Sequence, residues 1–348
     1  MTNATTPLPT PLEARDLILA VTPFERPDAR VAAAAVRAGA VGVLDLGHDR
    51  EEALAALRDT ARWSPGPFGV RVPSGCPVLP ADLPDAVDTV LLAAGAPWAP
   101  GDTGPKRRVL VEVTAPDDAP APGCGVDGLV ARGSESGGTI GELSTFVLLQ
   151  RLLAASGPRL PVWAAGGIGL HTAAGAVAGG AAGVVLDAQL ALTKEALEAL
   201  PSDVAAALRA MDGSETAVVD GRRLYSRPGP QLTGGPLPIG QDGAFAATLA
   251  ATYRTVGGIV QALRASIRTH MAAALATSPL AEGSGLARRG LRLPVAQGPM
   301  TRVSDRTAFA AAVAGGGGLP FLALALMGGS EVATLLAEAA EALAGKPW

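Results

Sequence analysis

The sequence predicts an α/β protein built on a (β/α)₈ TIM barrel that occupies residues 1–228. Short β-branched runs alternate with alanine-rich helical stretches, and eight such runs fall within about 190 residues. Most of the runs are continuously apolar, which is typical of parallel strands covered by helices on both faces. So many strands in so short a chain favour a closed barrel over an open sheet.

The expected elements follow one another in a βα rhythm. The strands are expected within 16–23, 41–47, 67–73, 86–95, 107–116, 126–133, 161–169 and 182–192, and the first two helices within 27–39 and 50–63. The connection after the fifth strand, DDAPAPGCG, is too polar and too rich in proline for a full helix. We therefore expect one outer helix to be missing or reduced to a turn.

Two further regions follow the barrel. Residues 229–290 are interpreted as a connector, with a loop at 234–243 and one amphipathic helix at 257–276. In residues 291–348 the stretch LPVAQGPMTRVSDRTAFAAAVAGGGG is similar to the chain's own residues 17–42, and a second helical stretch follows it. This repeat predicts the first two βα units of a second, incomplete barrel, and with it further domains C-terminal to residue 348.

Composition excludes several classes of partner and site. The 28 basic and 32 acidic side chains are spread without long blocks, so neither a nucleic acid nor a membrane surface is an expected partner. Cys76 and Cys124 lack the spacing of a zinc site, so no metal and no disulfide framework is expected. No export signal and no membrane-spanning run is recognisable, and a reducing cytoplasm is the expected compartment.

Glycine clusters follow the sixth and seventh expected strands, in RGSESGGTIGE (132–142) and AAGGIG (164–169). Loops after the seventh and eighth strands of such barrels commonly hold phosphate, and bare backbone N–H groups can approach an anion closely. The candidate ligand-binding residues are Gly137, Gly138, Gly166 and Gly167. The alternative is that these glycines only allow tight turns between strand and helix.

The segments ARGSESGGTIGELSTFVLLQRL and PVWAAGGIGLHTAAGAVAGGAAGVVL resemble the nitronate monooxygenase (2-nitropropane dioxygenase) family and the related flavin-dependent enoyl reductases. The resemblance covers residues 16–228 and includes VVDGRRLYSRPG near their end. It implies an FMN cofactor across the strand ends, with the phosphate near Gly166 and Gly167 and the ring edge near Gly137 and Gly138.

Several positions depart from that family's pattern. Thr139 stands where the family places a histidine that can act as a base, so the catalytic residue is unknown. Asp187 stands near the expected phosphate. Glu135 is a reserve candidate for acid or base, against the alternative of an exposed loop carboxylate. The first strand ends in ThrProPhe, whereas GlnGlyProMet at 297–300 matches the family better.

Arg71 stands where the family commonly has an asparagine that contacts the flavin. It is either an ion-pair partner at the rim or a cofactor-binding residue that compensates the charge of Asp187. The three histidines, His48, His171 and His270, are interpreted as exposed or structural.

These observations leave three functional hypotheses open. The first is an FMN-dependent oxidoreductase that acts on a small-molecule or carrier-bound acyl substrate. The second is a catalytically degenerate barrel that serves as a scaffold or docking module. The third is a barrel that binds some other phosphorylated metabolite. The tandem arrangement looks like the front end of type I polyketide or fatty-acid synthases, so the first two hypotheses place the chain in such a protein.

Overall fold

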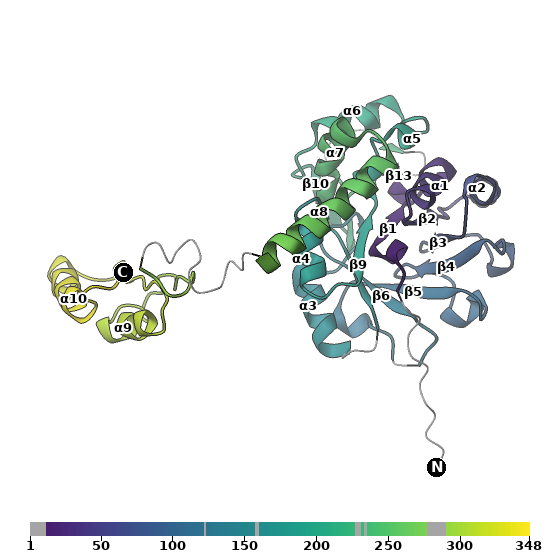
Figure 1. Ribbon diagram of the computed structural model, residues 1–348. Coiled ribbons are helices and arrows are strands. Elements are labelled where there is room, and N and C mark those ends of the chain that lie inside the picture. The colour runs from purple at the N-terminus through teal and green to yellow at the C-terminus, as the bar shows by residue number, and fades with distance from the viewer. Residues whose placement is uncertain (1–11, 122, 157–159, 227–230, 233–234, 277–289) are drawn as a thin grey trace, which may run out of the picture. The chain divides into compact units, whose positions relative to one another are not determined.

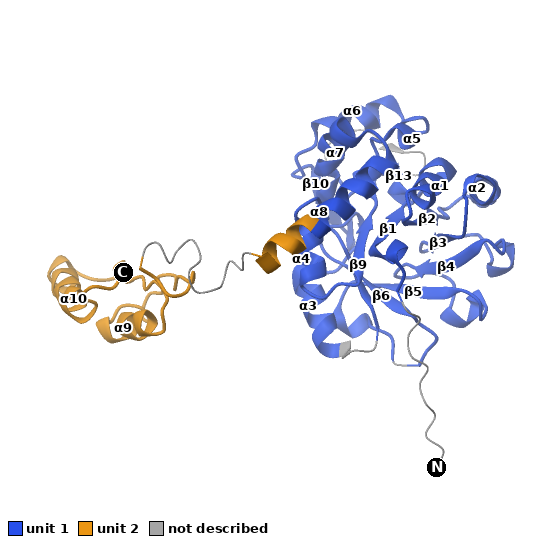
Figure 2. Cartoon of the chain, in the orientation of Figure 1, with its two compact units in different colours: residues 1–268 blue, residues 269–348 orange. Residues whose placement is uncertain are grey.

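The computed structural model describes residues 12–121, 123–156, 160–226, 231–232, 235–276 and 290–348. The chain forms two compact units, residues 1–268 and 269–348, which Figure 2 colours separately. The first unit therefore includes much of the segment that the sequence interprets as a connector.

Eight parallel strands close into a barrel in the first unit (Figure 1). They are β1 (Ile18–Val21), β2 (Val41–Asp45), β3 (Phe68–Val72), β4 (Val87–Leu92), β5 (Arg108–Val113), β6 (Gly128–Arg132), β8 (Val162–Ala165) and β9 (Gly183–Leu186). Each strand pairs with the next in this order, and β9 pairs with β1. The predicted (β/α)₈ barrel is confirmed.

Helices and short 3₁₀ turns connect and surround the strands. The α-helices of this unit are α1 (Ala29–Arg37), α2 (Arg50–Trp63), α3 (Thr145–Ser156), α4 (Thr172–Ala178), α5 (Lys194–Leu197), α6 (Ser202–Ala210), α7 (Ala246–Tyr253) and α8 (Val256–Ala276). The 3₁₀ turns are η1 (Ala14–Leu17), η2 (Pro23–Glu25), η3 (Pro80–Asp82), η4 (Pro100–Thr103), η5 (Pro116–Asp118), η7 (Ala188–Leu190) and η8 (Gln241–Phe245). The crossover after β5 has only η5 among its described residues, as predicted.

Local sequence explains how the first two helices begin. Asp28 precedes α1 and its carboxylate accepts hydrogen bonds from the backbone N–H groups of Arg30 and Val31. Asp49 does the same for α2, accepting from the backbone N–H of Glu52. Side chains of this kind satisfy N–H groups that have no partner within the helix, and they stabilise the helix start by about 1 kcal/mol.

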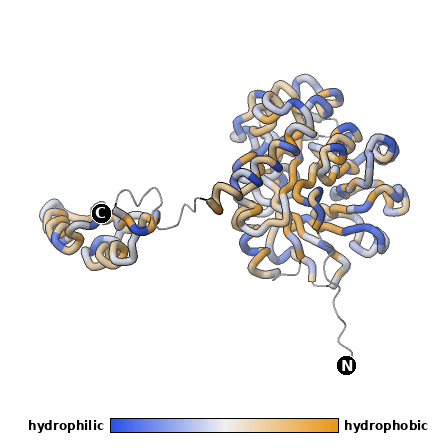
Figure 3. The backbone as a smooth tube through the Cα atoms, in the orientation of Figure 1, coloured by the Kyte–Doolittle hydropathy of each residue, from blue (hydrophilic) through white to orange (hydrophobic). Residues whose placement is uncertain are grey.

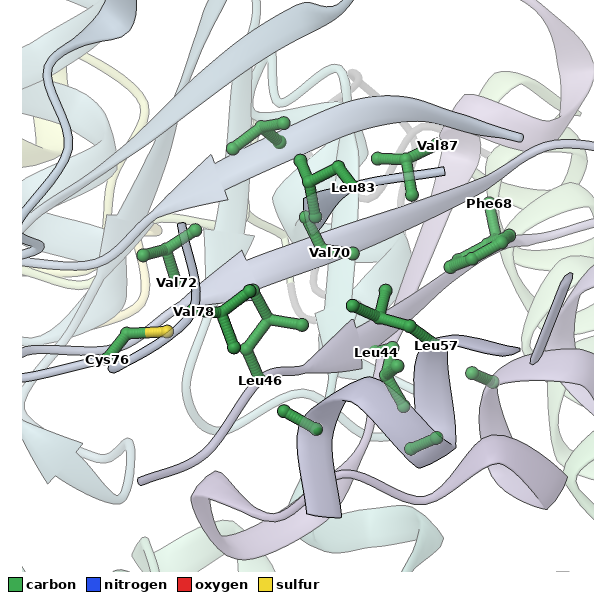
Figure 4. Close-up of a cluster of buried hydrophobic side chains, with 14 of the residues drawn as sticks. Leu44, Leu46, Leu57, Phe68, Val70, Val72, Cys76, Val78, Leu83 and Val87 are labelled. Atoms are coloured by element: carbon green, nitrogen blue, oxygen red, sulfur yellow. The ribbon is translucent and has the colours of Figure 1, made fainter. Parts of the chain in front are cut away.

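Two apolar clusters lie on the two sides of the barrel wall, and the strands are among the most hydrophobic segments in Figure 3. The outer cluster joins β2, β3 and β4 to α2 and includes Leu44, Leu57 and Phe68 (Figure 4). The inner cluster fills the barrel and includes the fully buried Trp163, whose indole Nε1 donates to the carbonyl of Asp16. The barrel is therefore a packed core and no open channel.

The chain after the last barrel strand returns to the barrel. Strands β10 (Thr216–Val219) and β11 (Arg222–Tyr225) form a hairpin, and β11 also pairs with β7 (Gly138–Thr139) in the loop after β6. Two short paired strands follow, β12 (Gln231–Leu232) and β13 (Gly235–Pro236). The predicted amphipathic helix is confirmed as α8.

Among its described residues, the second unit contains the end of α8, a parallel bridge between Ala296 and Leu319, and the helices α9 (Thr307–Gly315) and α10 (Gly329–Ala342). Its small buried cluster consists of Ala310, Ala339 and Leu343. That residues 291–348 begin a second barrel stays a prediction. In the described part of the chain, no helix is both long enough and apolar enough to cross a lipid bilayer.

Gly42→Ala is expected to lower the free energy of unfolding by about 2 kcal/mol, because overpacking a close contact forces the backbone to shift. A Cβ at this position on β2 would lie 2.1 Å from the carbonyl oxygen of Ala32 on α1. The matched control is Gly101→Ala, where a Cβ has nothing within 4 Å. Urea unfolding of both variants measures the difference, and equal stabilities would contradict the close packing of α1 on β2.

Candidate functional site

Charged side chains form the top layer of the barrel interior, at the carboxyl ends of the strands. Side chains two residues apart on a strand point to the same face, and on four strands a charged residue comes two positions after an apolar interior residue. These pairs are Val43 and Asp45, Leu110 and Glu112, Val130 and Arg132, and Val185 and Asp187. With Arg71 and Glu25 they make up what we call the charged layer: Glu25, Asp45, Arg71, Glu112, Arg132 and Asp187.

Arg71 occupies the middle of the charged layer and is only 3% exposed. Its Nε donates to Glu112 Oε1 at 2.8 Å and its Nη2 to Glu112 Oε2 at 2.9 Å, a two-pronged pairing. Its Nη1 donates to Asp45 Oδ2 at 2.7 Å. Of the two alternatives for this residue, the structure shows the ion pair, which is buried between strands.

Arg132 extends the layer toward the glycine loops. Its Nη1 donates to Glu112 Oε1 at 3.4 Å, and its Nη2 lies 3.5 Å from Asp187 Oδ2 and donates to the carbonyl of Gly137. Asp187 thus has a countercharge, and its Oδ1 also accepts from the backbone N–H of Ala188. The carboxylate that the sequence placed near a phosphate is engaged with the protein itself.

Glu25 enters the layer from a strained turn after β1. Phe24 and Glu25 have φ of 67° and 53°, a left-handed conformation that is costly for residues other than glycine. Glu25 Oε2 accepts from Arg222 Nη2 at 2.7 Å and lies 3.3 Å from His48 Nε2. Its Oε1 lies 3.9 Å from Arg71 Nη1. The turn therefore directs a carboxylate inward, where cations surround it.

The cations of the layer favour ionised carboxylates at Glu25 and Glu112, whereas at Asp45 burial outweighs the charge of Arg71 and raises the pKa. Burial alone raises the pKa of Glu25, but the hydrogen bond with His48 and the charges of Arg71 and Arg222 outweigh it and lower that pKa to about 2. Burial likewise raises the pKa of Glu112, and the charges of Arg71 and Arg132 hold it below its ordinary value. Both groups are therefore poor proton acceptors near neutral pH.

A cavity of about 20 Å³ is left beside the charged layer, which is room for roughly one water molecule. Its lining includes Phe24, Glu25, Arg71, Gly137, Gly138 and Pro238. Small-molecule sites usually have volumes of about 300–1,000 Å³. The cavity is therefore far smaller than a cofactor site.

The glycines after β6 serve close packing of the backbone. A Cβ at Gly137 would lie 2.7 Å from the backbone N of Gly240, and one at Gly138 would lie 3.0 Å from Glu25 Oε1. The segment that ends at Gly240 therefore lies directly on Gly137. Both glycines, which are the predicted candidates for the ring edge, line the cavity of about 20 Å³.

The glycines after β8 also have partners within the chain. A Cβ at Gly166 would lie 2.6 Å from Ser136 Oγ, and the carbonyl of Gly166 accepts from Thr145 Oγ1. The backbone N–H of Gly167 donates to Asp242 Oδ2 at 3.2 Å. The N–H group that the sequence analysis offers to a phosphate therefore has a carboxyl group as its partner.

The candidate acid and base residues lie away from the cavity or act structurally. Thr139 belongs to β7, where it pairs with Arg222 of β11, and it does not line the cavity. Glu135 Oε2 accepts from the backbone N–H and the hydroxyl of Thr145, at 2.9 and 3.0 Å, at the start of α3. Glu135 therefore stabilises the beginning of a helix.

The three histidines are dispersed. His48 contacts Glu25 at the edge of the charged layer, and its side chain is 51% exposed. His171 precedes α4 and His270 lies on α8. His48 thus contacts the charged layer through Glu25.

An FMN does not fit this arrangement. The charged layer occupies the barrel mouth, where Arg71 and Arg132 pair with carboxylates, and the cavity left beside it is about 20 Å³. At the other end, a phosphate would meet the carboxyl groups of Asp187 and Asp242. The charge of Asp187 opposes binding of an anion there, since like charges about 4 Å apart repel by on the order of 4 kcal/mol near a protein surface, and the carboxyl group of Asp242 already accepts from the backbone N–H of Gly167.

Sequence reasoning missed most of the charged layer, although a signal was present. Asp45, Glu112 and Arg132 each interrupt or end an apolar strand, in VGVLD, RVLVEV and GLVAR. A lone charge inside a buried strand needs a partner, so the sequence indicates that these residues are paired but does not say with which partner. Asp242, which lies in an expected loop, gave no comparable signal.

No protein-family model matches the chain. Among curated proteins it is 30% identical over 185 residues to the 5-hydroxy-7a-methyl-1-oxo-octahydro-1H-indene-4-carboxyl-CoA dehydrogenase of Mycobacterium tuberculosis. The match covers 48% of this chain and 50% of that dehydrogenase, so the chain spans about half the length of this curated relative.

Solved structures share the fold. FabK from Thermotoga maritima superimposes with a TM-score of 0.63 at 20% identity, over 75% of this chain and 96% of FabK, and a variant of it gives 0.64 at 22%. A nitroalkane oxidase from Streptomyces ansochromogenes gives 0.55 at 20% identity, over 73% and 97% of the two chains. At these identities the likeness shows the (β/α)₈ fold alone.

Arg71→Ala is expected to lower the free energy of unfolding by about 3–5 kcal/mol, because Glu112 and Asp45 lose their buried partner. Arg50→Ala is the matched control, because the Arg50–Asp82 pair has the same chemistry but Arg50 is exposed, and a change of less than about 1 kcal/mol is expected. Chemical denaturation of both variants tests the difference. Comparable losses would show that the charged layer is not a buried structural unit.

Glu25→Gln is expected to weaken the acid sensitivity of the fold. The pKa of Glu25 lies at about 2 in the folded chain against 4.5 ordinarily, so its stabilisation is present above pH 4.5 and is lost as the pH falls toward 2. That contribution is on the order of 3 kcal/mol, and the glutamine cannot titrate. Stability measured from pH 6 to about 2 should therefore fall less steeply in the variant. Parallel curves would contradict the ion pairing of Glu25.

Proposed function

We propose that residues 1–268 form a catalytically degenerate barrel of the nitronate monooxygenase and enoyl reductase type, which serves as a scaffold or docking module in a multidomain polyketide or fatty-acid synthase. The observation that carries this proposal is the charged layer. Arg71, with its donors directed to Glu112 and Asp45, stands in the barrel mouth where a ligand would bind. A mouth filled in this way supports a structural function.

The chemistry of the mouth supports the same conclusion. Proton transfer requires a group that can change its protonation state near the working pH and that can reach the substrate. Glu25 and Glu112 are held ionised by their cationic partners. Thr139 lies in a strand pairing and Glu135 begins a helix. None of these groups is placed to act as a general acid or base.

The wider context is proposed from the relatives and from the repeat. The name of the Mycobacterium tuberculosis relative describes a substrate carried as a CoA thioester. The second unit has the bridge and helices of a beginning barrel, and GlnGlyProMet at 297–300 resembles the flavin-binding family more closely than ThrProPhe does. We therefore propose a small-molecule or carrier-bound acyl substrate and a cytoplasmic location for the synthase to which this barrel belongs.

A second candidate function is an FMN-dependent oxidoreductase. The similarity to the CoA dehydrogenase and the shared fold with FabK and the nitroalkane oxidase favour it. In that case Gly137, Gly138, Gly166 and Gly167 would contact the flavin, and Arg71 would serve as a countercharge. The ion pairs of the charged layer would have to break before a flavin could bind. A measurement of FMN binding therefore distinguishes the two candidate functions.

The purified chain is expected to be colourless and to gain no thermal stability from added FMN, because the barrel mouth is filled by its own side chains. A ligand at a hundred times its Kd would stabilise the folded state by about 2.7 kcal/mol, which a thermal melt detects easily. The same melts with riboflavin, which lacks the phosphate, control for non-specific effects of the ring. A chain that retains flavin through purification, or whose Tm rises saturably with FMN, would favour the second candidate.

A further inference from the structure

Residues 237–245, which follow β13, pack into the mouth of the barrel, although the sequence predicts a loop at 234–243. Leu237 and Ile239 are fully buried, in a cluster with Phe24 and Ala188. The backbone N–H of Gln241 donates to the carbonyl of Glu135 at 2.9 Å. The segment is thus attached both by apolar packing and by a backbone hydrogen bond to the loop after β6.

The carboxyl group of Asp242, in this segment, accepts hydrogen bonds from the loops after β8 and β9. Its Oδ2 accepts from the backbone N–H of Gly167 and from Gln189 Nε2, both at 3.2 Å. The residue is 1% exposed, and its Oδ1 accepts no hydrogen bond from any described residue. Ser136 Oγ, close to Gly166, is likewise buried and makes no hydrogen bond with a described residue.

The two donors come from the loops that hold phosphate in many barrels of this fold. Gly167 follows β8, the seventh barrel strand, and Gln189 follows β9, the eighth. A phosphate oxygen held there would accept hydrogen bonds of the kind that Asp242 Oδ2 accepts. The carboxyl group therefore stands in the chemical role of a phosphate oxygen.

We propose that Asp242 is an internal substitute for a phosphate, and that it fastens residues 235–245 over the barrel mouth as a permanent lid. This inference deepens the proposed function and rests on it, since a closed lid suits a barrel that binds no flavin. It also explains why the glycine loops persist in a filled barrel: their donors bind the chain's own carboxyl group.

The proposal predicts what happens when the carboxyl group is removed. The N–H of Gly167 would then be a partly buried donor without its acceptor, which is costly, and a small oxyanion could replace the missing acceptor. Burial raises the pKa of Asp242 well above its ordinary value, and the charge of Asp187 adds to this effect. Because that charge also opposes an incoming anion, Asp187 is neutralised in the test.

The test compares two double variants of the full chain, Asp187→Asn with Asp242→Ala, and Asp187→Asn with Asp242→Asn as the matched control. The asparagine keeps an acceptor for Gly167, whereas the alanine does not. We expect the alanine variant to melt about 5 °C below the control and to recover at least half of that loss in inorganic phosphate, saturably. Sodium chloride at equal ionic strength should not restore it, and phosphate should leave the control unchanged.

The proposal would be overturned if the two variants had equal melting temperatures, or if sodium chloride restored the melting temperature of the alanine variant as well as phosphate does. Should the alanine variant not fold alone, refolding in phosphate is the second measurement: phosphate is expected to recover the folded form, and failure in both salts overturns the proposal. The outcome is distinct from that of the proposed function, which fails if the unaltered chain binds FMN. The phosphate titration tests whether the backbone N–H of Gly167 and Gln189 Nε2 can bind an anion, and its result does not depend on whether the unaltered chain binds FMN.

Discussion

The arrangement of the barrel mouth depends on one buried guanidinium group. Arg71 joins Glu112 of β5 to Asp45 of β2 across the barrel interior, and Arg132 continues the pairing toward Asp187. Removing one member would leave a buried charge without its partner, so the members constrain one another. A barrel of this fold commonly ends in a layer that can receive a ligand; here the layer is complete without one.

The glycines show how one residue type can serve two purposes. Bare backbone after β6 and β8 is what a phosphate or a flavin edge requires, and it is also what a tightly packed chain requires. In this protein Gly137 admits the backbone at Gly240, and Gly166 admits Ser136. At Gly137, the backbone surface that could contact a ligand is instead covered by the segment that follows the barrel. Similar glycine motifs therefore do not imply a shared cofactor.

The fold was largely predictable because its determinants are local. Alternating apolar runs, the helix caps at Asp28 and Asp49, and the proline-rich crossover after β5 each depend on a few neighbouring residues. The site was less predictable, because its contacts join distant parts of the chain. Arg71 and Glu112 are 41 residues apart, and Gly167 and Asp242 are 75 apart. The register of the barrel strands determines that Arg71 and Glu112 come into contact, and this register cannot be inferred from hydrophobic periodicity alone.

The most direct test is a crystal structure of the chain grown with excess FMN. The account predicts Arg71 paired with Glu112 and Asp45, the carboxyl group of Asp242 on the backbone N–H of Gly167, and no flavin density above Gly137 and Gly138. Density for an isoalloxazine ring in the mouth, with Arg71 turned away from Glu112, would contradict it.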